Sequence, residues 1–343
     1  MKNISELRQD PVTGAWVLIA TGRARRPQSF VQKDKRVVPP KESCPFENLM
    51  KDAVLALDNR GDSYRLTKKE LPYLKKNWLV QAVPNKYPAF GKGICQVERR
   101  LGPHHWMDGV GFHEVIITRD HERSMALMYP QEVASIIKIY RERYKTLKDE
   151  DCVEYISIFH NHGKEAGASI FHPHSQLIAT PVIPPDVSRS LKGSASYAHA
   201  HKNACVHCVM LAFERKDGRR IVYENRDFIV LCPYVSRTAL ETRIFPKHHN
   251  PRFEVSHDDD LPAIADALRV VLAKIYKGLG NPDYNFFIHT SPTTHAAEFD
   301  HYHWHMEILP KTAIWAGFEI STGIDISTIA PEKAAEFLRK VKI

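Results

Sequence analysis

No apolar run in this sequence approaches the roughly 20 residues that a membrane-spanning helix needs. Glu6, Arg8 and Asp10 precede the first apolar run, so the start also lacks the hydrophobic region of a signal peptide. The 343 residues include only six cysteines, and only Cys205 and Cys208 are close together, which favours metal binding in a reducing compartment over a disulfide framework. We therefore expect a cytoplasmic protein with no membrane partner.

Long blocks of lysine or arginine are also absent, although the formal net charge is +8. The basic residues are spread along the chain, and no stripe of basic and aromatic residues typical of nucleic-acid binding occurs. This pattern favours anionic small substrates over a nucleic-acid partner. A hydrophobic content of 43% excludes disorder, and the length favours two domains or a duplicated unit.

The most informative stretch is 159–181, which has a His-Pro-His at its centre. Alternate residues of an extended strand project from the same face, so His172 and His174 can serve one site. Pro173 stiffens the backbone between them. An accidental H-x-H is the alternative in a chain with 19 histidines, but the polar neighbours speak against it. These neighbours are Asn161, Gly163, Ser169 and Gln176.

Apolar spacing predicts the elements around this stretch. Val133, Ile136, Ile137 and Tyr140 recur at helical spacing, which indicates a helix from about Pro130 to Leu147. Strands are expected after the turn that begins at Asp10 and at 78–83, 112–118 and 155–159. Residues 49–75 look like a surface excursion, and 181–201 looks like a linker or long loop.

The second half of the sequence repeats the first. Tyr155–His160 matches Tyr284–His289 at identical spacing, and each run leads within about 15 residues to an H-x-H, the second being His303 and His305. The chain therefore looks like two diverged copies of one α+β unit. We place the halves at 1–190 and 191–343.

Each copy also contains a set of four residues suited to zinc, whose four ligands usually arrive as pairs from separate segments. The second copy has a Cys2His2 set with a C-x-x-C pair, for which reduced structural cysteines are the alternative reading. In the first copy a carboxylate replaces one thiolate, so zinc binding there is expected to be weaker. The sets are Cys205, Cys208, His249 and His303, and Cys44, Glu47, His121 and His172.

Five motifs follow one another in a recognisable order. They are Asp10-Pro-Val-Thr-Gly-Ala-Trp16, Arg23-Ala-Arg-Arg-Pro27, Asn85-Lys86-Tyr87-Pro88, His172-Pro-His174-Ser-Gln176 and Gly317-Phe318-Glu319. In these motifs the chain resembles the galactose-1-phosphate uridylyltransferase family, a duplicated branch of the histidine-triad superfamily, over nearly its whole length. The resemblance implies two histidine-triad-like units with an antiparallel sheet flanked by helices.

The resemblance also implies a two-step exchange of a nucleotide. His174 attacks the α-phosphorus of a nucleoside diphosphate sugar and becomes a nucleotidyl-histidine, from which a second phosphate takes the nucleotide. Gln176 donates to the phosphate, and His172 orients its neighbour through zinc. Arg23 and Arg26 reach the site of a neighbouring subunit, which implies a homodimer. The implied substrate-binding set is Arg23, Arg26, Asn85, Lys86, Tyr87, Asn161, Ser169, Lys311, Phe318 and Glu319.

Departures from the family pattern bear on the substrate. Ser190 lies near the position of a glutamate that binds iron in some members, and the C-x-x-C resembles the plant-like ADP-glucose phosphorylase branch. Phe318 replaces a tyrosine that contacts the sugar, but Glu319 can accept hydrogen bonds from sugar hydroxyls. We expect transfer of UMP between UDP-glucose and galactose 1-phosphate. The alternatives are ADP-glucose phosphorolysis, histidine-triad nucleotide hydrolysis and, least favoured, a zinc-stabilised nucleic-acid-binding module.

Overall fold

The computed structural model describes residues 4–20, 27–32, 36–95 and 97–343. Its centre is an 11-stranded sheet in the order β11-β12-β13-β15-β14-β9-β10-β8-β5-β3-β4, in which neighbouring strands are antiparallel. The strands of this sheet are β3 (Leu55–Asp58), β4 (Ser63–Tyr64), β5 (Trp78–Pro84), β8 (Phe112–Thr118), β9 (Tyr155–His162), β10 (His174–Thr180), β11 (Ile221–Glu224), β12 (Phe228–Leu231), β13 (Thr242–Pro246), β14 (Tyr284–His289) and β15 (His305–Pro310).

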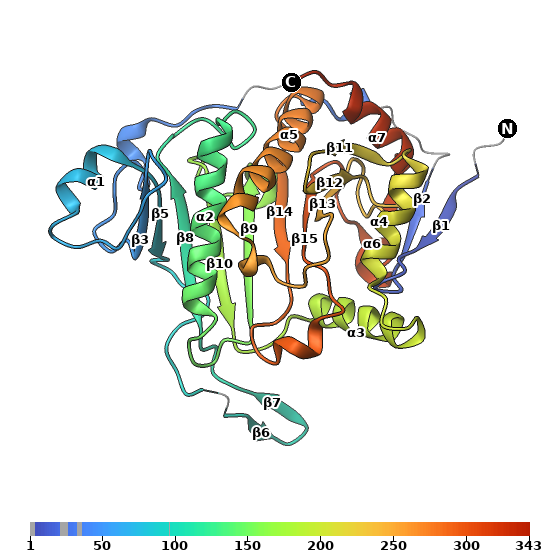
Figure 1. Ribbon diagram of the computed structural model, residues 1–343, viewed down its shortest axis with the longest axis horizontal. Helices are drawn as coiled ribbons and strands as arrows, with labels where there is room; N and C mark the ends of the chain where they lie inside the picture. The colour runs from blue at the N-terminus through green and yellow to red at the C-terminus, as the bar shows by residue number, and fades with distance from the viewer. Residues whose placement is uncertain (1–3, 21–26, 33–35, 96) are drawn as a thin grey trace.

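Two long helices cover one face of this sheet, α2 (Pro130–Leu147) and α5 (Leu261–Leu279) (Figure 1). The predicted bounds of α2 are confirmed. Pro130 occupies its first turn, and the Glu132 carboxylate accepts the Tyr129 N–H, so the helix start is capped. The apolar faces of both helices and the strand residues beneath them form one continuous core.

The smaller elements lie around the other face and the ends of the sheet (Figure 1). A three-stranded sheet has the order β1-β2-β16, and β6 pairs with β7 in a separate arm. These elements are β1 (Glu6–Gln9), β2 (Trp16–Ile19), β6 (Arg99–Leu101), β7 (His104–Trp106), β16 (Asp325–Ser327), α1 (Leu71–Asn77), α3 (Pro185–Ala200), α4 (Val206–Asp217), α6 (Gly317–Thr322) and α7 (Pro331–Lys340).

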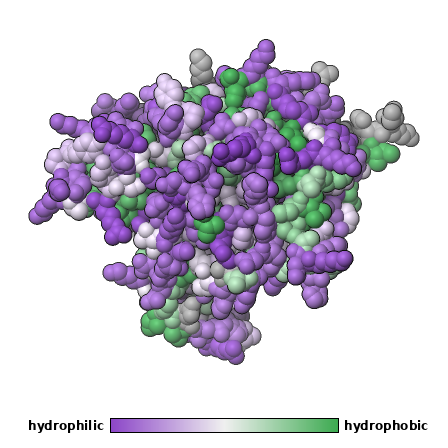
Figure 2. Space-filling model, in the orientation of Figure 1, coloured by the Kyte–Doolittle hydropathy of each residue, from purple (hydrophilic) through white to green (hydrophobic). Residues whose placement is uncertain are grey.

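The surface over α2 and α5 is mostly hydrophilic, and the arm at the bottom of the view carries both hydrophobic and hydrophilic residues (Figure 2). The exposed apolar side chains there include Leu101 and Trp106. Helices in the described ranges are all too short or too polar to cross a membrane.

The two halves are joined edge to edge by β9 and β14, which confirms the predicted duplication. On either side of this pair the strands follow in mirrored order, β10-β8-β5-β3 and β15-β13-β12-β11. Phe159 lies opposite Gln176 in one half, Phe287 lies opposite Glu307 in the other, and the two phenylalanines lie opposite each other. The pseudo-twofold axis therefore passes through this phenylalanine pair. The boundary that we predicted after residue 190 would cut through α3. No observation tests it, and it stays a prediction.

Strand register corrects the sequence match between the copies by one residue. His160 lies opposite Ser175, whereas Ile288 lies opposite Met306, the residue that follows the second H-x-H. Ile288 is thus the counterpart of His160, and His289 is the counterpart of Asn161. A shift of one residue moves a side chain to the opposite face of a strand, so the two matched histidines face different environments.

Two segments expected to be irregular are regular instead. Within 49–75, β3 is a buried strand of the main sheet rather than part of a surface excursion. Within 181–201, the predicted linker is the 16-residue helix α3. Pro185 occupies the first turn of α3. Backbone N–H groups in the first turn have no partner within the helix, so a proline, which has no N–H, costs no hydrogen bond there and can begin a helix.

One cysteine pair also departs from expectation. Cys95 and Cys152 form a disulfide, with their Cα atoms 5.6 Å apart. The prediction of metal-binding or reduced cysteines is therefore wrong for these two residues, which lie 57 positions apart in the sequence.

Gly193 gives a test of the packing of α3. A Cβ at this position would overlap the carbonyl oxygen of Val12, in a turn that Asp10 holds by accepting two backbone N–H groups. An alanine normally stabilises a helix by about 1 kcal/mol relative to glycine. We expect Gly193→Ala to lower the melting temperature instead, by overpacking that costs about 1–3 kcal/mol.

Ser196→Ala, at an exposed position of the same helix, is the control and should leave the melting temperature unchanged or slightly higher. A Gly193→Ala protein that melts at or above the wild-type temperature would contradict the close approach of Gly193 to the Val12 carbonyl.

Candidate active site and metal centres

His174 begins β10 on the face of the sheet opposite α2 and α5. Its Nδ1 lies 2.8 Å from the backbone oxygen of His172, so the neutral ring donates its proton there and keeps the lone pair on Nε2. The side chain is buried, and Phe46 packs edge-on with ring centroids 5.2 Å apart. Burial lowers the pKa of His174, which favours the neutral ring.

Two amide side chains flank this imidazole, and each has its oxygen engaged. Gln176 Oε1 lies 2.8 Å from His113 Nε2, and Asn161 Oδ1 accepts from Asn285 Nδ2 at 2.7 Å. Neither amide NH2 has an acceptor among the residues that the structure describes. Both groups are therefore left as donors next to His174, as an anionic ligand requires.

The structure adds two residues that we did not predict at this site, His113 and Asn285. Asn285 belongs to the second half and follows Tyr284 in a strand that we matched in the wrong register, so its place beside Asn161 was missed. His113 is the second residue of β8 and lies diagonally across the ladder from Gln176. The available signal was a histidine in the first part of this strand, before its run of apolar residues begins.

The predicted nucleotide loop lies next to His113. Asn85 donates its backbone N–H to the His113 carbonyl at 2.7 Å, whereas Lys86 and Tyr87 are exposed. Ser169 is also exposed, in the turn before His172.

The predicted second-copy zinc set is brought together. Its four potential ligand atoms all lie within 4.8 Å of one another; they belong to Cys205, Cys208, His249 and His303. Cys208 Sγ lies 3.5 Å from His249 Nδ1 and 3.4 Å from His303 Nδ1. A hydrogen bond between the thiols lowers the pKa of Cys205 and raises that of Cys208, so the pair releases its first proton readily.

The first-copy set is brought together as well. Its four potential ligand atoms also lie within 4.8 Å of one another; they belong to Cys44, Glu47, His121 and His172. Glu47 Oε2 lies 3.2 Å from His121 Nδ1, and Cys44 Sγ lies 3.5 Å from His172 Nδ1. Within the described ranges, His121 Nδ1 and Glu47 Oε2 are buried without a hydrogen-bond partner. Such unpartnered buried atoms fit a cation between them.

All four histidines of the two sets are oriented in the same way. Each has Nε2 next to a backbone oxygen, that of Pro39 for His121, Thr118 for His172, Asp300 for His249 and Pro246 for His303, at 2.5–3.0 Å. The carbonyls hold the proton on Nε2, so Nδ1 is free to bind a metal.

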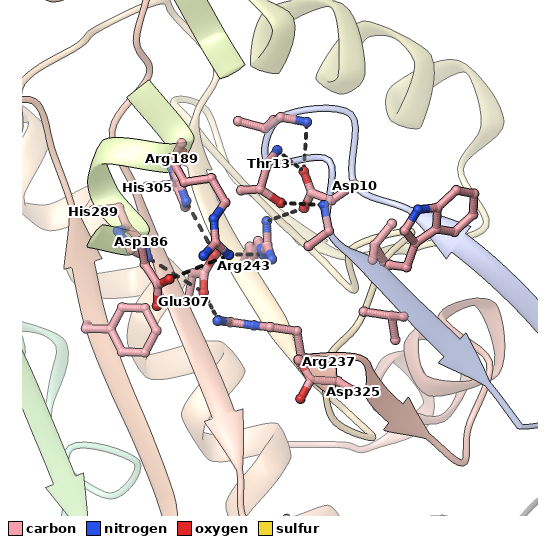
Figure 3. A pocket seen from close by; sticks show the side chains of 18 of the residues that line it. Asp10, Thr13, Asp186, Arg189, Arg237, Arg243, His289, His305, Glu307 and Asp325 are labelled. Atoms are coloured by element: carbon pink, nitrogen blue, oxygen red, sulfur yellow. Dashed lines mark hydrogen bonds and ion pairs between the residues drawn. The ribbon is translucent and has the colours of Figure 1, made fainter. Parts of the chain in front are cut away.

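The counterpart of the His174 region in the second half is a cavity of about 420 Å³ (Figure 3). Here His305 replaces His174 and repeats its bond to the carbonyl two residues earlier, while Glu307 replaces Gln176. Burial would raise the pKa of Glu307, but the guanidinium groups of Arg237 and Arg243 hold it well below the usual range. His289, His305 and Glu307 are close enough to hold a cation, but both Glu307 oxygens already contact these arginines.

Several predicted substrate residues do not lie beside His174. Glu319 lines this second cavity, its carboxylate accepts the Ala316 N–H, and Phe318 and Lys311 are exposed nearby. Lys311 follows β15, which is three strand spacings or roughly 14 Å from β10. Ser190 contacts Tyr302, and Arg23 and Arg26 lie outside the described residues.

Two models of known protein families match this chain. A family model described as galactose-1-phosphate uridyl transferase, N-terminal domain, matches residues 1–184, and a model for a domain of unknown function matches residues 104–341. The chain belongs to the galactose-1-phosphate uridylyltransferase family. It is a nucleotidyltransferase by this membership.

Relatives of two activities in this family match the whole chain. An ADP-glucose phosphorylase of Arabidopsis thaliana is 32% identical over 98% of this chain and 93% of its own length. A galactose-1-phosphate uridylyltransferase of Thermotoga maritima is 28% identical over 98% and 99%. The crystal structure of the Arabidopsis ADP-glucose phosphorylase with bound ADP-glucose superimposes with a TM-score of 0.78 at 28% identity and covers 99% of this chain and 100% of that one.

The Cys2His2 set leads to a test of metal content. We expect Cys205→Ser to remove about one zinc per chain and to lower the melting temperature, because a filled tetrahedron of protein ligands is structural. Metal analysis and thermal unfolding measure both quantities.

Cys232→Ser is the control, since this buried thiol belongs to neither set. It should lower stability and leave zinc unchanged. A Cys205→Ser protein that loses turnover but keeps its zinc and its melting temperature would show that the set is not a structural metal centre.

Proposed function

We propose that this protein transfers UMP between UDP-glucose and a hexose 1-phosphate, namely galactose 1-phosphate, through a nucleotidyl-histidine. The observation that carries the proposal is the hydrogen bond from His174 Nδ1 to the His172 carbonyl. It leaves a neutral imidazole with its Nε2 lone pair available, which is the form of histidine that attacks phosphorus.

In the first step, Nε2 of His174 forms a bond to the α-phosphorus of the donor. The bond from that phosphorus to the bridging oxygen breaks, and sugar 1-phosphate leaves with the electron pair. In the second step, a phosphate oxygen of the acceptor attacks the same phosphorus and displaces His174. The imidazole is neutral again, so no external base is consumed.

The two amides supply stabilisation as negative charge builds on the α-phosphate oxygens. Gln176 and Asn161 both direct NH2 groups away from their oxygen partners, and these donors are already oriented before substrate binds. Such donors cost no reorganisation during the reaction, and removing one typically slows a reaction by about 10²–10³.

The metal sets would support this chemistry without taking part in it. Cys44, Glu47, His121 and His172 would hold a zinc ion that fixes the segment before His174, and Cys205, Cys208, His249 and His303 would hold one in the other half. The bound ion supplies rigidity. The His172 carbonyl, which accepts the proton of His174, would be held in place by the ligation of its own side chain.

The separation of the substrate residues supports a homodimer. Lys311 follows a strand that lies three strand spacings, roughly 14 Å, from the strand of His174. Glu319, which follows Phe318 in the chain, lines the second cavity. A second copy that brings these residues to His174 would complete the site. Arg23 and Arg26 would reach the partner's nucleotide from the same direction.

ADP-glucose phosphorolysis is the second candidate, and the similarity to the Arabidopsis ADP-glucose phosphorylase favours it. Glu319 is the reason that we rank transfer to a hexose 1-phosphate above ADP-glucose phosphorolysis. A carboxylate accepts hydrogen bonds from sugar hydroxyls but repels bare phosphate.

The nucleophile is tested by labelling. His174→Gly should abolish transfer of radioactive nucleotide from UDP-glucose or ADP-glucose to the protein, because no other Nε2 is expected to attack the donor. His305→Gly is the matched control and should still be labelled, since Glu307 places a negative charge beside His305. Labelling of folded His174→Gly protein at the wild-type level would refute the assignment.

The acceptor is tested by Glu319→Ala. We expect the rate of hexose 1-phosphate exchange to fall on the order of tenfold or more, because the sugar loses its hydrogen bonds to a charged group. The rate of phosphorolysis should change little. Glu336→Ala, which removes an exposed carboxylate on α7, is the control. Equal losses in the two assays, or faster wild-type turnover of ADP-glucose with inorganic phosphate, would favour the phosphorylase.

A further inference from the structure

His113 lies where the nucleotide loop, β8 and the catalytic strand β10 meet. Its Nδ1 lies 3.1 Å from the backbone nitrogen of Ala89, which donates to it. Its Nε2 lies 2.8 Å from Gln176 Oε1 and 3.1 Å from Asn85 Nδ2. The half-buried ring thus contacts the loop on one side and the amide of Gln176 on the other.

The protonation of this ring follows from its neighbours. A backbone N–H always donates, so Nδ1 of His113 must be the acceptor, and the proton of the neutral ring lies on Nε2. Asn85 cannot receive that proton, because its oxygen already accepts the Tyr87 N–H and its NH2 faces the ring. The one acceptor among these neighbours is the Gln176 oxygen.

This arrangement excludes the opposite orientation of the Gln176 amide. If its NH2 group faced the ring, His113 would meet donors at both nitrogens and its own proton would have no acceptor. An imidazolium fails as well, because a protonated Nδ1 would face the Ala89 N–H. His113 therefore holds the Gln176 oxygen, and the NH2 group turns away from it.

We propose that His113 is a positioning residue that sets the orientation of the Gln176 amide and couples it to the nucleotide loop. This inference rests on the proposed function, in which the Gln176 NH2 group donates to the α-phosphate. Through the Ala89 hydrogen bond, a donor nucleotide that orders the loop also holds His113, and with it the amide, in the orientation for phosphate.

Two substitutions distinguish the hydrogen bond between His113 and Ala89 from the hydrogen bond between His113 and Gln176. In His113→Asn, the shorter amide oxygen can accept the Ala89 N–H, but the donor to Gln176 is lost. In His113→Gln, the longer amide can place an NH2 group near the position of Nε2 and donate to Gln176. The assay is single-turnover transfer of α-phosphate label to the full chain, over a range of UDP-glucose concentrations up to saturation and, separately, of ADP-glucose concentrations.

We expect His113→Asn to slow the labelling step on the order of tenfold, the effect of one lost hydrogen bond, with little change in the half-saturating donor concentration. His113→Gln should restore most of the rate. Added to Gln176→Ala, His113→Asn should have no further effect, because it acts through the missing amide. Melting temperatures should stay close to that of the wild type.

Three results would overturn the inference: an unchanged rate in His113→Asn, a His113→Gln protein as slow as His113→Asn, or an equal slowing by His113→Asn with and without Gln176. In each case wild-type labelling would leave the proposed function intact. If the wild type were labelled by neither donor, the proposed function would fail, and the inference would fail with it.

Discussion

The antiparallel pairing of β9 with β14 is the constraint on which the rest of the structure depends. It joins two half-sheets into one continuous surface and lets α2 and α5 share a single core. Its register also places Asn285 of the second half against Asn161 of the first. A residue of one copy therefore orients a residue in the site of the other. This contact gives the second half a role in the site even though its own counterpart of the site has diverged.

A second constraint is the single proton of each neutral imidazole. In His174 the carbonyl of His172 accepts the proton of Nδ1, so Nε2 keeps its lone pair. In the histidines of both metal sets, carbonyls take the proton on Nε2, so Nδ1 is the free nitrogen. These five imidazoles are the same chemical group, and they differ in which ring nitrogen meets a backbone oxygen. The backbone path thus decides which nitrogen of each imidazole keeps its lone pair.

Much of the site was predictable because its signals are local or chemically rare. The H-x-H, the C-x-x-C and the helical spacing that predicts α2 all lie within short segments, and zinc chemistry accepts few residue types. The grouping of the two metal sets followed from these signals.

The features that were missed depend on tertiary contacts. The register of Tyr284–His289 could not be read from spacing, because β9 carries His160 towards the core and Asn161 towards the site. The helix α3 begins at a proline that looked like a loop signal, β3 is only four residues long, and Cys95 and Cys152 meet through the fold alone. His113 has no motif of its own, and only its three neighbours give it significance.

The comparison of His174 with His305 shows how one position changes the chemistry of a shared framework. Both rings donate from Nδ1 to the carbonyl two residues earlier, and both lie on the same face of the sheet. The residue two positions later is a neutral amide in one case and a carboxylate held ionised by Arg237 and Arg243 in the other. Glu307 Oε1 lies 3.5 Å from His305 Nε2, so this ring has an ionised carboxylate beside it where His174 has a neutral amide two positions later in the chain. The same charge, paired with two guanidinium groups, instead anchors the N-terminal turn through Arg243 and Asp10. The carboxylate of Glu307 thus belongs to an ion-pair cluster that also requires Arg237, Arg243 and Asp10, and the amide of Gln176 has no such partners among the described residues of the first half.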